Sequence, residues 1–137
     1  MGLVVCGYGA LAILSSWQAA MGSTGVVRLF KNDYHPSIND DPSKYVQADF
    51  PGYAPKNVGW NAPVWKGTYA ELDAATGLTW TATAGGGAPV YGYYVCGSDG
   101  TLWWAERDPA APVDMSGAGF AYTVTLLLAL SSQYTSG

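Results

Sequence analysis

Charged residues and histidine are scarce in this chain of 137 residues. Lys and Arg together number 6, Asp and Glu number 10, and there is 1 histidine, so charged residues make up 12% of the chain and the net charge is -4. An ordinary soluble domain carries about 25% charged residues. The cations are scattered along the chain and form no basic stripe, which argues against binding to nucleic acid.

The few histidines and cysteines exclude several kinds of chemical site. His35 is the single histidine and lies in a stretch rich in Pro, Asn and Asp, so neither a His-based catalytic triad nor a multi-His metal site can be assembled. Cys6 and Cys96 are far apart and form neither a disulfide framework nor a zinc set. We expect inert thiols. The glycine clusters lack the P-loop lysine and the dinucleotide fingerprint, so we predict no cofactor and no metal.

Acidic residues give little support for catalysis. The carboxylates within residues 33–41 lack the spacing and the bidentate Glu of a calcium loop. Glu71 or Asp73 together with Glu106 would form a pair for glycoside hydrolysis only if the fold held them about 5 to 10 Å apart. With no base and no nucleophile identified, we predict that the chain is not an enzyme. A small secreted hydrolase is the competing hypothesis from this class.

Apolar and aromatic residues, in contrast, are abundant. Hydrophobic residues make up 49% of the chain, which holds 6 Trp and 10 Tyr. With so little charge, part of the surface must be covered by copies of the chain, a larger assembly, a membrane or carbohydrate. Trp and Tyr serve in cores and protein interfaces, and they also stack on sugar rings. Trp103 and Trp104 are adjacent on a predicted strand, so we expect one ring inside and one outside.

The N-terminal segment has three interpretations. Residues 3–21 carry no charge, and about 20 apolar residues would span a bilayer, but no cation precedes Arg28 to orient a span or a signal peptide. We favour an amphipathic helix of about three turns that contacts a neighbouring copy rather than its own sandwich. Its apolar positions recur at helical spacing: Ala10, Ile13, Leu14, Trp17 and Met21.

The rest of the chain has the pattern of strands and turns. It predicts a mainly β fold, an antiparallel β-sandwich of about 7 to 8 short strands with one N-terminal helix. The clearest element is a hairpin around Asp99-Gly100. The predicted strands are Val26 to Phe30, 45–50 (strand or helical turn), 58–60, 64–72, 78–84, 90–96, 102–107, and 122–130, the last buried on both sides. We divide the chain into an N-terminal arm (1–24), a sandwich (25–131) and a C-terminal tail (132–137).

Four sequence blocks follow one another along the chain: Leu29-Phe30-Lys31-Asn32-Asp33, then Ala-Asp-Phe-Pro-Gly-Tyr-Ala at 48–54, Val-Tyr-Gly-Tyr-Tyr-Val at 90–95, and Leu-Trp-Trp-Ala-Glu-Arg at 102–107. In order and spacing they resemble a family of small tailed-bacteriophage virion proteins, over about residues 10–130. The resemblance implies a short N-terminal helix, a strand ending in Phe-x-Asn and a final strand rich in Val and Thr. It also implies a structural component of the particle without enzymatic activity.

On this basis the chain is predicted to be a capsid decoration or cement subunit that stabilises the head by protein contacts. The expected partners are copies of itself, with a trimer favoured, and the major capsid protein or other virion proteins. We expect it in the virion, assembled in the host cytoplasm, without membrane contact. A tail or fibre module that binds host surface glycans is the alternative.

Aromatic anchors with a charged rim are what such an interface requires. The turn from Phe50 to Tyr53 is expected to present two rings, and Glu106 with Arg107 is expected to supply rim contacts. The predicted interface residues are Leu11, Leu14, Trp17, Phe50, Tyr53, Trp60, Trp65, Glu106 and Arg107.

Overall fold

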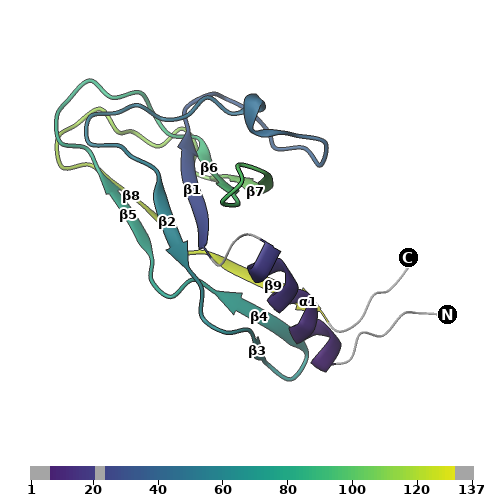
Figure 1. The fold of residues 1–137 in the computed structure, drawn as a ribbon. Helices are drawn as coiled ribbons and strands as arrows, with labels where there is room; N and C mark the ends of the chain where they lie inside the picture. The colour runs from purple at the N-terminus through teal and green to yellow at the C-terminus, as the bar shows by residue number, and fades with distance from the viewer. Residues whose placement is uncertain (1–6, 21–23, 132–137) are drawn as a thin grey trace.

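A computed structural model describes residues 7–20 and 24–131. Within these residues the chain forms one helix and nine strands in antiparallel sheets (Figure 1). The mainly β, sandwich-like class with an N-terminal helix is therefore confirmed, with one strand more than the upper estimate. Cys6, Met21 and the predicted tail at 132–137 lie outside the described residues.

The largest sheet has four strands in the order β2-β1-β6-β7. These strands are β1 (Thr24–Phe30), β2 (Lys56–Gly59), β6 (Gly92–Cys96) and β7 (Leu102–Arg107). The main core is the cluster of buried side chains that includes Phe50, Trp80, Val95 and Tyr122. Side chains alternate across β1, so that Val27 and Leu29 enter this main core while Phe30 lies on the opposite face. The hairpin of β6 and β7 is confirmed, and Gly100 adopts a φ of 86° in its turn, a backbone conformation that favours glycine.

A two-stranded sheet closes the main core from the other side. It pairs β5 (Leu78–Thr81) with β8 (Ala121–Val124). Trp80 and Tyr122 are buried in the core with Val27 and Val95, while Thr79 and Thr123 share a hydrogen bond on the exposed side. Along β5 the apolar Leu78 and Trp80 face the core and alternate with threonines, so the predicted strand at 78–84 is confirmed over residues 78–81.

The third sheet has three strands in the order β3-β4-β9 and carries the helix. Its strands are β3 (Val64–Trp65), β4 (Tyr69–Asp73) and β9 (Leu127–Ser131). The helix α1 (Gly7–Ala20) lies beside this sheet (Figure 1). Its Ala10 and Leu14 pack onto Ala70 and Leu72 of β4. The expectation that the helix contacts a neighbour instead of its own chain is wrong for this face. Ala10 has a small side chain, which lets the helix approach the sheet closely.

Two predicted strands are each divided in the structure. Residues 64–72 form β3 and β4, joined by a tight turn in which Gly67 has a φ of 93°. Residues 122–130 form β8 and β9, because the chain pairs first with β5 and then crosses at the buried Leu126 to pair with β4. The expectation that 122–130 is buried on both sides is wrong, since Thr123, Thr125 and Leu127 are exposed.

The segment from 31 to 50 covers the outer face of the large sheet. It contains no strand, only the 3-10 turn η1 (Pro42–Lys44) and a single bridge between Phe30 and Gln47. Tyr45 is buried there, stacked on Tyr94 at 4.9 Å between ring centroids and edge-on to Phe30 at 5.1 Å. This packing converts the outer face of the sheet into a second small core.

Candidate protein-interaction surface

Several predicted interface residues belong to the interior of the chain. Leu14 and Phe50 are each 2% exposed, so the structure corrects their role from interface contacts to core residues. Leu11 of α1 and Trp65 of β3 are half-buried against the helix cluster, which consists of Ala10, Leu14, Ala70 and Leu72. An apolar side chain satisfies a core and an interface equally well, which is why the sequence did not separate the two.

The turn from Phe50 to Tyr53 is formed, but its rings point inward. The Tyr53 amide donates to the Phe50 carbonyl at 2.9 Å, and Gly52 has a φ of 90°. The two rings meet edge-on at 5.4 Å. The Tyr53 hydroxyl accepts from the Leu29 amide at 3.2 Å and from Gln47 at 2.9 Å. The expectation that this turn presents two rings to a partner is therefore wrong.

Glu106 and Arg107 have separate partners within the chain. Arg107 forms an ion pair with Asp33 at 2.6 Å and lies over the Tyr91 ring at 5.3 Å from its centroid. The exposed Glu106 carboxylate accepts from the Tyr93 hydroxyl at 2.8 Å. These contacts tie β7 to the segment after β1 and to β6, and they leave Glu106 within reach of solvent.

Four tryptophans connect the layers. Trp60 touches both the main core and the helix cluster, and its ring centroid is 5.8 Å from that of Trp104. Trp17 on α1 is 42% exposed and lies 6.4 Å from Trp103. The register of β6 and β7 shifts at this point, because Val95 pairs with Trp104 and the next residue pairs with Leu102. Trp103 is thus the extra residue of a bulge.

The two adjacent rings have different surroundings. Trp104 packs against the main core as expected for one ring, whereas Trp103 contacts Trp17 of the helix and is half-buried rather than fully outside. The indole nitrogen of Trp103 is buried with no hydrogen-bond partner and lies against Gly97, where a side-chain carbon would come within 2.8 Å of it. A register shift of this kind depends on the partner strand, so alternation within β7 did not reveal it.

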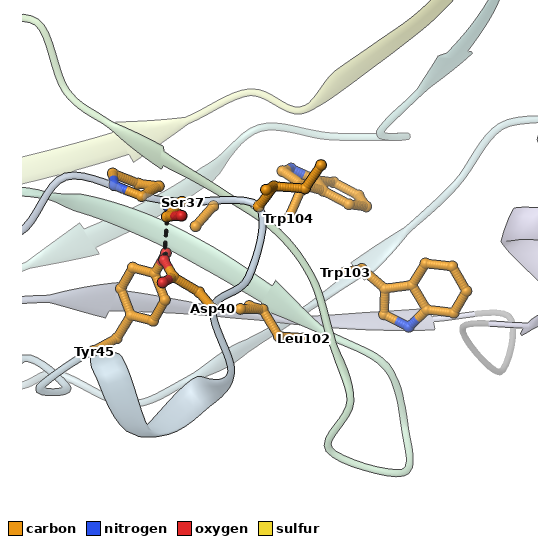
Figure 2. Close-up of a pocket in the computed structure, with 9 residues that line it drawn as sticks. Ser37, Asp40, Tyr45, Leu102, Trp103 and Trp104 are labelled. Atoms are coloured by element: carbon orange, nitrogen blue, oxygen red, sulfur yellow. Dashed lines mark hydrogen bonds between the residues drawn. The ribbon is translucent and has the colours of Figure 1, made fainter.

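A groove of about 360 Å³ runs between the segment 36–45 and β7 (Figure 2). Its walls are Pro36, Ser37, Ile38, Asp40, Tyr45, Leu102, Trp103, Trp104 and Ala105. The Ile38 side chain at the rim is 98% exposed. The groove therefore combines aromatic walls, an apolar rim and one carboxylate.

Asp40 organises the loop side of the groove. Its carboxylate accepts from the Ser37 amide at 2.8 Å and from the Tyr45 hydroxyl at 2.7 Å, and these three residues lie together in Figure 2. It also accepts from the Tyr34 hydroxyl at 2.5 Å. Burial alone would raise the pKa of Asp40, but these hydrogen bonds outweigh it and hold the pKa below its ordinary value. The carboxylate is thus kept ionised as the anchor of the loop.

Large apolar side chains are also spread over the outside of the chain. Eight of them are between 38% and 98% exposed: Tyr8, Ile13, Trp17, Ile38, Val46, Val64, Phe120 and Leu127. They lie on the helix, on the loop beside the groove and on the edges of the smaller sheets. The predicted helix face was partly wrong, because Ile13 and Trp17 remain on the surface while Leu11 and Gln18 are half-buried.

The carboxylate pair considered for glycoside hydrolysis, Glu71 or Asp73 with Glu106, is not formed. Glu71 on β4 interacts with Asp73 on the same strand, whereas Glu106 is paired with Tyr93 in another sheet. Across residues 7–20 and 24–131, no group of three or more His, Cys, Asp and Glu is placed to hold a metal ion. His35 is exposed, and Cys96 is a free, buried thiol whose pKa is raised by burial.

Within the described part of the chain, no helix has the length and apolar character needed to cross a membrane. The chain matches no protein-family model, and comparison with curated proteins and with solved structures gives no significant match.

Proposed function

We propose that this chain is a bacteriophage virion structural protein, most specifically a capsid decoration or cement subunit that stabilises the head by protein contacts. The observation that carries the proposal is the set of eight exposed large apolar side chains on a chain with 12% charged residues. In a symmetric shell the same surfaces are buried in every copy against its neighbours, and contacts on several sides of the chain would remove these side chains from water.

The resemblance of four sequence blocks to small tailed-phage virion proteins supports the same proposal. In this account the chain resides in the virion after assembly in the host cytoplasm. Its partners are copies of itself and the major capsid protein or other virion proteins. A trimer remains the prediction from sequence. The protein has no enzymatic role and holds no cofactor in this proposal.

The experiment compares solution mass with particle binding. The purified chain is examined over a range of concentrations and then mixed with particles of the encoding phage from which its gene has been deleted. We expect self-association and saturable binding to the head. A chain that stays a single copy at high concentration and does not sediment with the particles would refute the proposal.

The groove favours a second candidate, a tail or fibre module that binds host surface glycans. Its volume of about 360 Å³ is in the usual range for small-ligand sites, and the half-buried Trp103 and Trp104 offer rings for stacking beside the Asp40 carboxylate. Retention of the chain on host polysaccharide, lost in Trp104→Ala and kept in Trp65→Ala, which changes a ring outside the groove, would support it. Retention unaffected by Trp104→Ala would exclude the groove.

A further inference from the structure

The three-stranded sheet has one face covered by α1 and one face that we call the open face. The open face consists of Val64, Lys66, Tyr69, Glu71, Asp73, Leu127 and Ala129. Directly opposed residues of paired strands share a face, and Val64 opposes Glu71 while Leu127 opposes Asp73. The helix cluster uses the alternate residues of the same strands, Ala70, Leu72, Leu128 and Leu130.

Apolar side chains on the open face reach solvent. Val64 is 50% exposed and Leu127 is 55% exposed, on the two outer strands of the sheet. Among the described elements, α1 is the one that packs extensively on this sheet, and it does so from the other side. A single uncovered sheet face with apolar flanks is typical of an interface.

The charges on the open face are separated by strand. Glu71 lies at the centre of β4 and is 9% exposed, and the Oδ1 atom of Asp73 is buried with no hydrogen-bond partner. Lys66 is exposed at the end of β3, where its amide donates to the Tyr69 carbonyl at 2.8 Å. The face thus carries a buried acidic centre and an exposed cation at one side.

The Glu71 carboxyl of the acidic centre has a raised pKa. A hydrogen bond with Asp73, followed by burial, raises the pKa of Glu71, and Lys66 together with a hydrogen bond with Tyr69 offsets this only in part. Lys66 of the same chain thus acts on Glu71 but does not bring its pKa back to the ordinary value.

We propose that the open face is the contact surface for a second copy of this chain, packed face to face about a two-fold axis. In such a contact residue i of one copy meets residue j of the other, and j meets i. Lys66 of each copy then lies against Glu71 and Asp73 of the other. Val64 and Leu127 surround these charges and exclude water, which strengthens the attraction.

The size of the face determines the strength of this pairing. β3 has two residues while β4 and β9 have five each, so strands spaced about 4.8 Å apart with a rise of about 3.3 Å per residue cover on the order of 190 Å² per copy. Stable complexes bury about 1,200 to 2,000 Å² in total. The contact between two copies is therefore weak in free solution, and its occupancy rises where an assembly holds the copies close together. This unit is a dimer, in contrast to the trimer expected from sequence.

A cross-linking experiment tests the contact directly. Equal amounts of unlabelled and isotope-labelled full-length chain are mixed at high concentration and treated with a carbodiimide, which joins amines to carboxylates in contact. We expect mixed-isotope peptides that link Lys66 to Glu71 or Asp73. Absence of such a linkage, or its presence only within single copies, would overturn the proposal.

Charge exchange provides the specificity control. Lys66→Glu and Asp73→Lys should each weaken self-association about tenfold, because each symmetric contact becomes repulsive twice. The double variant should restore it. Lys56→Glu, an exposed cation on β2 in a different sheet, should change nothing. If Lys56→Glu weakens association as much as Lys66→Glu, the effect is one of net charge and the proposal is wrong.

A second variant avoids dependence on the half-buried Asp73. Val64→Glu changes a half-exposed position, so the fold is expected to persist while the pairing is lost. The inference rests on the proposed self-association, and particle binding separates the two. Particle binding without the Lys66 linkage refutes the inference alone, while failure to bind particles refutes the proposed function.

Discussion

Replacement of Gly92 by alanine tests why the third sequence block has a glycine at its centre. Gly92 is buried in β6, where it pairs with Phe30 on one side and Arg107 on the other. A side-chain carbon at this position would lie 2.1 Å from the backbone oxygen of Glu106 and 2.8 Å from the Phe30 ring. Neither neighbour is the end of a flexible side chain, so the ladder between β6 and β7 would have to separate.

The magnitude follows from this crowding. Overpacking typically costs about 1 to 3 kcal/mol, and displacement of backbone places Gly92→Ala at the upper end, about 3 kcal/mol. Gly59 is the matched control, because it also lies in a strand of the same sheet and no atom is within 4 Å of its added carbon. Gly59→Ala should stabilise the chain by about 0.5 kcal/mol through lost freedom of the unfolded chain.

The assay is urea unfolding followed by tryptophan fluorescence, with the free energy of unfolding compared between the two variants. A Gly92→Ala variant within about 1 kcal/mol of the unaltered chain would refute the reasoning, since this is below the smallest cost of moving backbone. The expected result would assign the Val-Tyr-Gly-Tyr-Tyr-Val block to the fold rather than to a partner contact.

Three further predictions concern the aromatic residues and the loop. Burial raises the pKa of Tyr94 from 10.0 to about 12, so the free energy of unfolding should fall as pH rises through this window, and Tyr94→Phe should flatten the fall in alkaline melts. An unchanged pH profile in Tyr94→Phe would contradict this. Trp17→Ala should lower the free energy of unfolding by about 1 to 2 kcal/mol, measured by urea unfolding, because the contact with Trp103 is lost. An unchanged free energy of unfolding would mean that this contact does not stabilise the fold. Asp40→Asn should lower the Tm and speed hydrogen exchange at the Ser37 amide; protection equal to that of the unaltered chain would show that the carboxylate does not anchor the loop.

Local signals in the sequence predicted the parts of the fold that depend on neighbours along the chain. The hairpin around Asp99-Gly100 was correct because alternation and a glycine with positive φ are both encoded within a few residues. The predicted strand at 78–84 was correct over residues 78–81 for the same reason, since Trp80 alternates with threonines.

Pairing between distant segments was beyond these signals. The division of 122–130 depends on which strand lies alongside, first β5 and then β4, and the apolar run at 126–128 is the same in either case. The bulge at Trp103 likewise depends on β6.

The interface residues were the least predictable part of the sequence analysis. Phe50 and Leu14 are as apolar as any interface anchor, yet the fold places them inside. Ile38 and Val64 were missed because single apolar residues in a polar loop and in a short strand give no pattern. Lys66 stands beside Gly67 in the sequence. This position indicates a cation on the same sheet face as Glu71 only once β3 and β4 are known to form a hairpin.

An image of the phage particle at side-chain resolution tests the central claim most directly. The account predicts this chain on the outside of the head, in regularly repeated copies, with Ile38, Val64 and Leu127 covered by neighbouring subunits. A particle that lacks the chain, or one in which these side chains face water while the groove holds a host glycan at the tail, would contradict it.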